Sequence, residues 1–145
     1  MLEKIHDTEN KIMKLELLNC YIPKDVQSLI DKGEIKEDFH YNSDWKFEGR
    51  IQDELVGLIA YTKCKFKDGK ELPRFIHVLI VPKFRGKKEA RILLHLTESH
   101  LKKSGYNQVC AHIKNNRRYM QRSATHHGYL EYLKDDDSKY YYKNI

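Results

Sequence analysis

A basic, glycine-containing loop follows the most apolar stretch of the chain. Residues 75–81 read FIHVLIV, and Pro82 ends this run because proline has no N–H to donate to a strand ladder. The sequence RGKK at 85–88 comes next, where a helical pattern begins. The first turn of a helix carries unpaired backbone N–H groups and a partial positive charge, so the loop suits a phosphate group. The alternative is an ordinary strand-to-helix turn with solvated lysines.

Two regular elements must hold this loop in place. The run at 75–81 is β-branched and too short for a membrane span, which predicts a strand buried on both faces. Over 87–103 the apolar side chains share one helical face, and Ser104-Gly105 ends the helix. The apolar residues of this helix are Ala90, Leu93, Leu94 and Leu101.

The loop and its flanks resemble a known signature. The stretch IVPKFRGKKEA at 80–90 is similar to V-x-P-x-x-R-G-x-G-x-G/A, the acetyl-coenzyme A signature of the GNAT superfamily of N-acetyltransferases. Lys88 stands where a glycine is usual, and a side chain there would crowd the pyrophosphate, demand a strained backbone or add a phosphate-pairing charge. The matching positions are Pro82, Arg85, Gly86 and Ala90, with Ile80 replacing valine.

The resemblance implies a divergent member of that superfamily with an α/β fold. Its mixed, mostly antiparallel sheet would contain a splayed parallel strand pair that admits acetyl-coenzyme A as cosubstrate, flanked by helices. The acetyl carbonyl would lie near the backbone of Val78, Leu79 and Ile80. An amine would attack the thioester directly in a ternary complex. The residues implied in phosphate binding are Phe84, Arg85, Gly86, Lys87, Lys88, Glu89 and Ala90.

A second signature of the superfamily is half present. Asn116 matches its asparagine in type, and Gly128-Tyr129 matches its Gly-Phe pair. Ala124 occupies the position where many members carry a tyrosine that protonates the leaving thiolate. Tyr119 and Ser123 are the nearby hydroxyl groups that could replace it, and protonation by water is the alternative.

Two histidines are candidates for the base that the reaction needs. A lysine-type ammonium has a pKa of about 10.4, so it must lose a proton before it attacks at neutral pH. His77 and His112 lie on the two strands expected to splay, and imidazole titrates in the useful range. The alternative is that each is structural, because strand parity does not fix which face it occupies, and Glu71 and Glu131 are further candidates for the base. The pair His126-His127 is interpreted as a helix C-cap, and no metal spacing is evident.

The N-terminal third predicts helices and an aromatic loop. Apolar residues among lysines and glutamates over 9–21 favour a helix, and Val26, Leu29 and Ile30 predict a short second helix that Gly33 ends. The aromatic segment 37–45 would either cap the core or border the acceptor site. The GNAT resemblance implies a first strand before these helices, and residues 1–6 are the segment that could form it.

The rest of the chain alternates strands and helices. Strands are expected at 45–51 and 55–67, with a tight turn at Asp68-Gly69 before the strand that holds residues 75–81. A strand at 108–113 should run parallel to it through a right-handed crossover. Asn116 should cap a helix that Gly128 ends, and a hairpin with an acidic turn at 134–138 should close the fold.

Composition limits the class of protein. The 145 residues are expected to form one domain, 1–145, and a net charge of +6 favours an anionic ligand or partner. Three scattered cysteines indicate neither a disulfide framework nor a zinc site. With neither a signal peptide nor an apolar run of membrane-spanning length, a cytoplasmic protein without a membrane partner is expected.

Two other functions stay open. One is a degenerate acetyltransferase fold that serves as an interaction module. The other is nucleic-acid binding through Arg117, Arg118, Arg122 and the lysines, which is less favoured and would weaken steeply with salt. The acceptor could be a small molecule, a peptide or a protein, and the resemblance leaves homodimerisation open.

Overall fold

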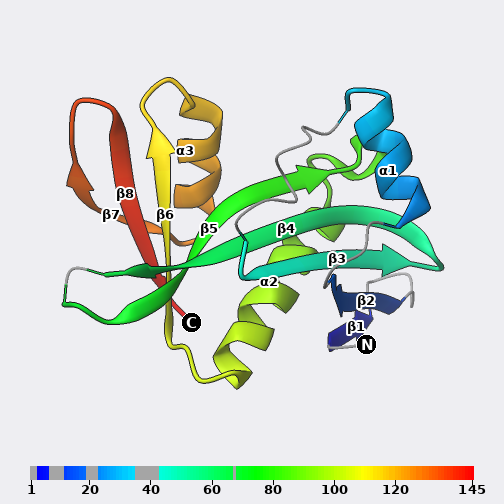
Figure 1. The fold of residues 1–145 in the computed structure, drawn as a ribbon, viewed down its shortest axis with the longest axis horizontal. Helices are drawn as coiled ribbons and strands as arrows, with labels where there is room; N and C mark the ends of the chain where they lie inside the picture. Colours follow the sequence, from blue (N-terminus) through cyan, green and yellow to red (C-terminus); the bar gives the residue numbers. More distant parts are fainter. Residues whose placement is uncertain (1–2, 7–11, 19–22, 35–42, 67) are drawn as a thin grey trace.

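A single sheet organises the residues that the computed structural model describes, namely 3–6, 12–18, 23–34, 43–66 and 68–145. Within them eight strands follow the order β1-β2-β3-β4-β5-β6-β8-β7, and only β5 and β6 are parallel (Figure 1). The strands are β1 (Glu3–His6), β2 (Ile12–Leu17), β3 (Trp45–Ile51), β4 (Glu54–Lys65), β5 (Glu71–Ile80), β6 (Gln108–Lys114), β7 (Leu130–Lys134) and β8 (Ser138–Asn144). The helices are α1 (Lys24–Asp31), α2 (Lys88–Lys103) and α3 (Arg118–His126), with a 3-10 turn η2 (Pro82–Phe84) after β5. The predicted fold class is confirmed.

The N-terminal hairpin corrects one prediction. Strand β2 lies where a helix was expected over 9–21, and it pairs with both β1 and β3. Met13 and Leu15 are fully buried, whereas Lys14 between them is exposed, so the segment follows the two-residue period of a strand. Pairing with β3 outweighs the helix propensity of its Leu, Lys and Glu residues. Residues 35–42, most of the aromatic segment, lie outside the described residues.

Helix α1 covers one face of the sheet, as its pattern predicts. Val26 is fully buried against Leu55 and Leu58 of β4. Gly33, with φ +74°, follows the helix in the left-handed conformation that glycine adopts at helix ends. Arg50 of β3 donates two hydrogen bonds to the Asp25 carboxylate, at 2.7 and 2.9 Å, which ties the start of α1 to the sheet.

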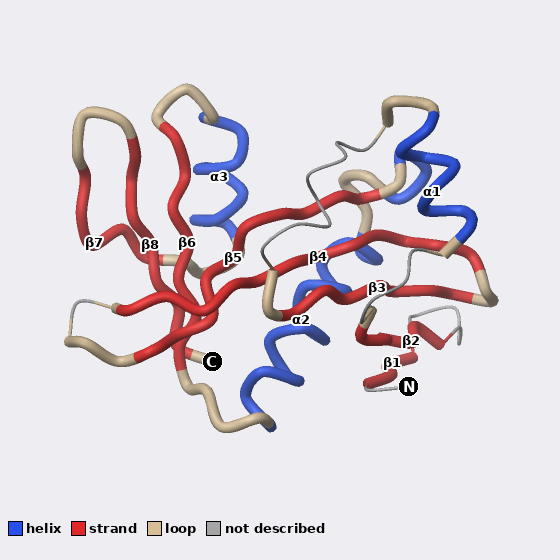
Figure 2. Tube along the Cα trace, in the orientation of Figure 1, coloured by secondary structure: helices blue, strands red, loops and turns tan. Residues whose placement is uncertain are grey.

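Helix α2 covers the opposite face (Figure 2). Leu93 is fully buried over Gly57, where an added Cβ would lie 2.4 Å from the backbone oxygen of Leu79. The absence of a side chain at Gly57 therefore lets the helix lie close to the sheet. Tyr61 of β4 and Thr97 of α2 are buried and hydrogen-bonded through their hydroxyls at 2.9 Å. The predicted helix over 87–103 is confirmed, with Lys88 as its first residue.

Strands β3, β4 and β5 form the predicted antiparallel series. Gln52 and Asp53 have positive φ, as a two-residue hairpin turn requires. Opposite β4, the register of β5 shifts between Ala60 and Tyr61, so that Ile76 is an extra residue in β5. The bulge ends the regular ladder and bends the strand.

Strand β6 runs parallel to β5, but the two pair only at Arg74 with Cys110 and Phe75 with Ala111. Beyond Phe75, immediately before the bulge, β5 turns away and a gap opens between the strands (Figure 1). The prediction that 75–81 is buried on both faces is wrong, because side chains such as Val78, 36% exposed, line that gap.

The C-terminal part contains α3 and the predicted hairpin of β7 and β8. Asn116 is not the cap of α3; Arg117 occupies that position and makes no side-chain cap hydrogen bond. The neighbouring Asn115 instead donates its amide to the Asp136 carbonyl at 3.0 Å. Gly128, with φ +89°, ends the helix as predicted. Among the described residues no helix is both long enough and apolar enough to span a membrane.

Candidate functional site

A cavity of about 1080 Å3 passes through the gap between β5 and β6. Its walls come from β5, the loop before α2, the first turns of α2, β6 and α3. Side chains of both sheet faces reach it: Leu79 packs towards α1, whereas Ile80 belongs to the core under α2. The cavity therefore reaches side chains of both faces of the sheet.

The loop after β5 is anchored at both ends. Phe84 is buried, 8% exposed, and belongs to the core rather than to the cavity wall. Arg85 lines the cavity and donates from Nε to the Ile80 carbonyl at 2.9 Å, which joins the loop to the end of β5. Gly86 has φ +71°, with open space where a Cβ would be. The glycine is thus required by backbone conformation.

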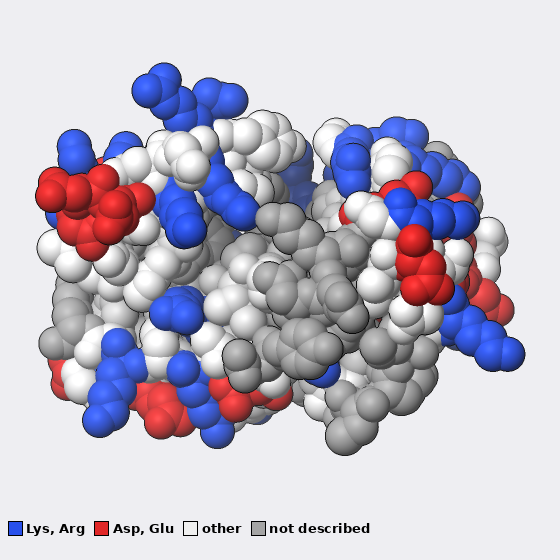
Figure 3. Space-filling view, turned by 45° about the horizontal axis from the view of Figure 1, so that its top comes forward, with Lys and Arg blue, Asp and Glu red and all other residues white. Residues whose placement is uncertain are grey.

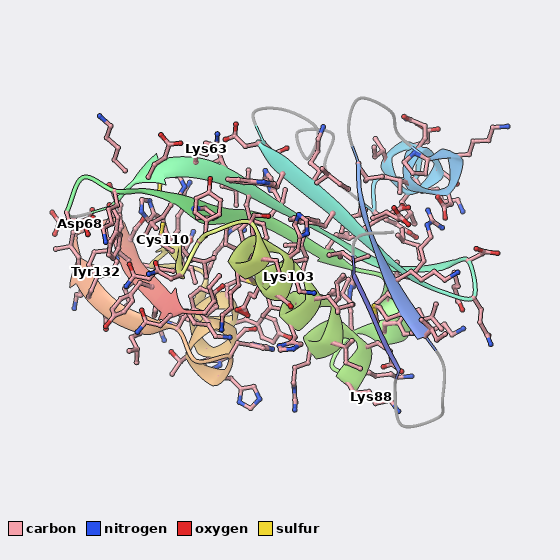
Figure 4. The ribbon with its side chains drawn as sticks, turned by 90° about the horizontal axis from the view of Figure 1, so that it is seen from below. Lys63, Asp68, Lys88, Lys103, Cys110 and Tyr132 are labelled. Atoms are coloured by element: carbon pink, nitrogen blue, oxygen red, sulfur yellow. The ribbon has the colours of Figure 1, made fainter. Side chains whose placement is uncertain are left out.

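Lys88 imposes no backbone strain, although it replaces a glycine of the signature. It begins α2, and Gln52 and Asp53 are the non-glycine residues with positive φ among those described. Lys88 and Glu89 do not line the cavity, whereas Lys87 and Ala90 do. Figure 4 shows Lys88 at the end of α2 beside the N-terminal strands. A side chain at this position therefore leaves the cavity clear.

The backbone segment predicted to bind the cofactor lies at the cavity. Val78, Leu79 and Ile80 all line it. Because β6 pairs with β5 only as far as Phe75, β6 leaves the facing edge of these residues open. An extended ligand arm could hydrogen-bond there as a strand does. Asn116, by contrast, is exposed and outside the cavity wall.

Helix α3 brings both hydroxyl candidates to the cavity. Tyr119 is 71% exposed, and Ser123 is partly buried with its Oγ 3.4 Å from His127 Nδ1. His127 is the C-cap residue, as expected, and its ring nitrogen lies 2.7 Å from the Ser123 carbonyl. Ala124 lines the same wall, so no larger side chain replaces the usual tyrosine at that point.

Both candidate histidines line the cavity. His77 pairs with Ala60, on the sheet face that α1 partly covers. His112 stacks edge-on against Tyr140 with ring centroids 4.4 Å apart. Burial, with a smaller effect of the Arg74 charge, lowers the pKa of His112, and Asp135 opposes that shift. A neutral imidazole is therefore favoured at pH 7.

Several cavity residues escaped the sequence-based assignment of the cofactor site. Arg91, Arg117 and Arg122 line the cavity, although the last two were expected only as nucleic-acid contacts. The i, i+4 spacing of Arg91 from Lys87 would have indicated it. Tyr129 also lines it, and its buried hydroxyl has no hydrogen-bond partner among the described residues.

The cavity wall is strongly cationic. Within the described lining Glu34 is the only carboxylate, against six lysine and arginine side chains and four histidines. Figure 3 shows Lys and Arg atoms around a notch between the part that carries α3 and the part that carries α1. The wall thus favours an anionic ligand. No group of three His, Cys, Asp or Glu side chains in the described ranges could hold a metal ion.

Two cysteines lie together although the sequence separates them. Cys64 and Cys110 are free thiols whose sulfur atoms are 3.1 Å apart. Figure 4 shows Cys110 in the half of the sheet that also holds Tyr132. Burial raises the pKa of the Cys110 thiol, so it stays protonated. Cys20 lies outside the described residues.

Comparison with known proteins identifies the fold. No protein-family model and no curated protein sequence matches the chain. Solved structures do match: a GNAT family acetyltransferase from Elizabethkingia anophelis with acetyl-CoA bound has a TM-score of 0.68 at 12% identity, over 92% of this chain and 98% of that one. The PaiA N-acetyltransferase from Thermoplasma acidophilum, in complex with coenzyme A, has a TM-score of 0.64 at 13% identity, over 92% of this chain and 99% of that one.

A third likeness spans nearly all of both chains. A GNAT family acetyltransferase from Listeria monocytogenes has a TM-score of 0.65 at 10% identity and covers 99% of this chain and 100% of that one. The identities are low, as in a divergent sequence, and the likeness extends through the N-terminal hairpin. The chain resembles GNAT acetyltransferases across most of its length and has their fold.

Proposed function

We propose that the chain is a single-domain N-acetyltransferase that transfers the acetyl group of acetyl-coenzyme A to a primary amine. The observation that carries the proposal is the cavity through the gap between β5 and β6, with the Gly86 loop and the start of α2 at one end. A thioester held in the gap would be accessible from both sheet faces. Two substrates could then meet without displacing each other.

Acetyl-coenzyme A fits the residues of the cavity. Arg85, Lys87 and Arg91 line the end next to the start of α2, where anionic phosphates are stabilised. Arg117 and Arg122 add positive charge from α3. The volume of about 1080 Å3 lies just above the range of roughly 300–1,000 Å3 typical of small-molecule sites.

The proposed reaction is direct acyl transfer. The amine nitrogen attacks the thioester carbon, a C–N bond forms, and the C–S bond breaks with its electron pair leaving on sulfur. The amine loses one proton and the thiolate gains one, so the reaction needs no redox partner. His77 and His112 are the proposed groups that accept the proton from the amine.

The proton for the thiolate has two proposed sources on α3. The Ser123 hydroxyl and the Tyr119 hydroxyl both belong to residues of the cavity wall. If one of them is the donor, Ser123→Ala or Tyr119→Phe should lower kcat by roughly 100- to 10,000-fold without changing acetyl-coenzyme A affinity, given the usual range for general acid catalysis. An unchanged kcat in both variants would leave water as the donor.

Thermal unfolding with and without acetyl-coenzyme A tests the cofactor site. At about a hundredfold excess over the dissociation constant, binding should raise the unfolding free energy by roughly 2.7 kcal/mol, several degrees in Tm. Gly86→Glu should abolish the shift, because it disturbs a left-handed loop residue of the cavity wall.

Gly69→Glu is the matched control. Gly69 has φ +81° and open space around it, like Gly86, but lies in the turn before β5 and outside the cavity. Both variants should lose similar stability without ligand, and only Gly86→Glu should lose the ligand-induced shift. The absence of a shift in the wild type at millimolar acetyl-coenzyme A would refute the proposal.

A further inference from the structure

An arginine and a histidine lie in contact at the base of the gap. Arg74 Nη1 is 3.4 Å from Nδ1 of His112, which lines the cavity. The guanidinium is always a donor, so Nδ1 accepts in this contact and a neutral His112 carries its proton on Nε2. Arg74 itself lies next to the cavity wall rather than in it, beside His112. The pair therefore presents N–H donors at the edge of the cavity and no acceptor. In this tautomer the Nε2–H of His112 is a hydrogen-bond donor, so of the two proposed bases His77 is the one left to accept the proton from the amine.

The bulge in β5 places this pair on the same face as His77. Arg74 pairs with Thr62, and His77 pairs with Ala60. Thr62 and Ala60 are two residues apart on β4, so their side chains lie on the same face. Residues three apart share a face only because Ile76 is the extra residue between them. Cys110 pairs with Arg74 across β5 and β6, so His112, two residues on, also lies on that face.

That face is opposite the proposed phosphate site. Helix α2 packs on the other face through Leu93, and its first turn carries the Gly86 loop. A cofactor whose phosphates lie at α2 would enter the gap from that side. The second substrate would then reach the thioester from the side of Arg74, His77 and His112.

Described carboxylates near the pair already have hydrogen-bond partners. Asp44 accepts hydrogen bonds from the hydroxyl of Thr62, the cross-strand partner of Arg74, and from the Lys63 backbone N–H. Within the described residues, no carboxylate lies within ion-pair distance of Arg74. Asp135 is the acidic group that acts on His112, and it already accepts hydrogen bonds from the Tyr140 hydroxyl and from the backbone N–H groups of Asp137 and Ser138. The Tyr140 ring packs against His112 and holds the imidazole beside Arg74.

We propose that the acceptor is a primary amine that also carries an anionic group, a carboxylate or a phosphate, which Arg74 and His112 bind while His77 faces the amine. The inference rests on the proposed acetyltransferase function. Guanidinium groups bind both kinds of anion through paired N–H donors. The amine and the anion of one molecule would be bound by neighbouring residues of one sheet face.

Matched amines test the preference. Purified protein saturated with acetyl-coenzyme A is given ω-amino acids, aminoalkyl phosphates, the corresponding neutral amides and diamines of equal chain length. Thiol release and product mass give kcat and KM. For an anionic acceptor, kcat/KM should exceed that of its neutral partner by about tenfold or more, as expected of charge-assisted hydrogen bonds. Whether carboxylates or phosphates are preferred identifies the anion.

Arg74→Met should reduce this preference to near unity, chiefly through KM, while the acetyl-coenzyme A thermal shift is unchanged. Arg74→Lys keeps the charge but loses the paired donors, so part of the preference should return. Lys65→Met is the control: Lys65 is an exposed cation of β4 on the alternate face from Thr62, so its removal should change neither value.

Three results would overturn the inference. Preference for neutral amines or diamines would contradict it, as would an anion preference that Arg74→Met leaves intact. The third result is that acetyl-coenzyme A binds, but no anionic amine is acetylated and none shifts the His112 imidazole NMR signals. In these cases the cofactor shift still supports the acetyltransferase proposal. The loss of that shift, together with the absence of acetylation, would instead refute the proposed function.

Discussion

The helix after β5 and the helix after β6 border the same cavity, yet α2 buries Leu93, Leu96, Thr97, Glu98 and Leu101, and α3 buries none of its residues. Helix α2 spans sixteen residues, whereas α3 spans nine. Its described anchors include the hydrogen bond from Gln121 Nε2 to the Lys114 carbonyl and partial packing of Met120 and Ala124. The end of the cavity at the start of α2 is thus built on the core, whereas the wall formed by α3 is weakly held.

Core truncation should show the largest difference between the helices. Leu93→Ala removes a fully buried side chain of α2 and should lower the unfolding free energy by roughly 2–5 kcal/mol. Met120→Ala in α3 removes a partly buried one and should cost less, about 1 kcal/mol. Urea unfolding measures both. Equal losses would contradict the contrast between the two walls.

Glycine substitutions sharpen the same contrast. Gly57→Ala would place a Cβ 2.4 Å from the Leu79 backbone oxygen beneath α2, and overpacking of this kind should cost about 1–3 kcal/mol. Gly128→Ala, after α3, has its nearest neighbour at 3.6 Å, so its cost of about 1–2 kcal/mol is that of a left-handed backbone alone. Thermal unfolding should rank Gly57→Ala as the more damaging. The reverse order would mean that the sheet under α2 can adjust.

Tyr129 lies where the two helices approach the same core. Its buried hydroxyl has no partner among the described residues, so Tyr129→Phe should raise the unfolding free energy by about 1 kcal/mol. Differential scanning calorimetry of the two proteins measures the change. Destabilisation instead would show that a bound water or another group pairs with this hydroxyl.

The smallest expected effect is the change in stability with pH that comes from Glu98 in α2. Burial raises the pKa of Glu98, and the hydrogen bond from Lys143 of β8 only partly opposes it. The folded state therefore holds this proton more tightly than the unfolded state, and the stability so gained is lost as pH rises from about 4.5 through the folded pKa. The Tm of the wild type relative to Glu98→Gln should fall over that interval. A rise would mean that Lys143 dominates.

The contrast between the helices also explains how far the sequence predicts the structure. Helix α2 was predicted almost to the residue, because its apolar face is buried and its periodicity is therefore complete. Helix α3 was expected to start at Asn116, but Asn115 is used by the β7–β8 turn and Arg117 takes the cap position. Contacts with a segment twenty residues away leave no local pattern.

The same reasoning applies to the strands and the site. Leu15 and Met13 of β2 are good helix formers, and only pairing with β3 makes them strand residues. The Gly86 loop could be found from its motif. Arg74 and His112 could not be paired, because their contact depends on the β5–β6 register. The shared face of Arg74 and His77 could not be predicted either, because it depends on the bulge at Ile76. The proposed roles of His77, His112, Tyr119 and Ser123 stay predictions.

The extra residue in β5 has a consequence for how such a cavity arises. Deleting Ile76 would leave Arg74 and His77 on the same face, now two positions apart, and would change no other side chain of the cleft. The strand would lose its bend, however, and β5 could continue its ladder with β6 past Phe75. The opening would then be sealed by ordinary sheet hydrogen bonds. One surplus amino acid in the length of a strand, rather than the identity of any residue, thus keeps this sheet from being continuous.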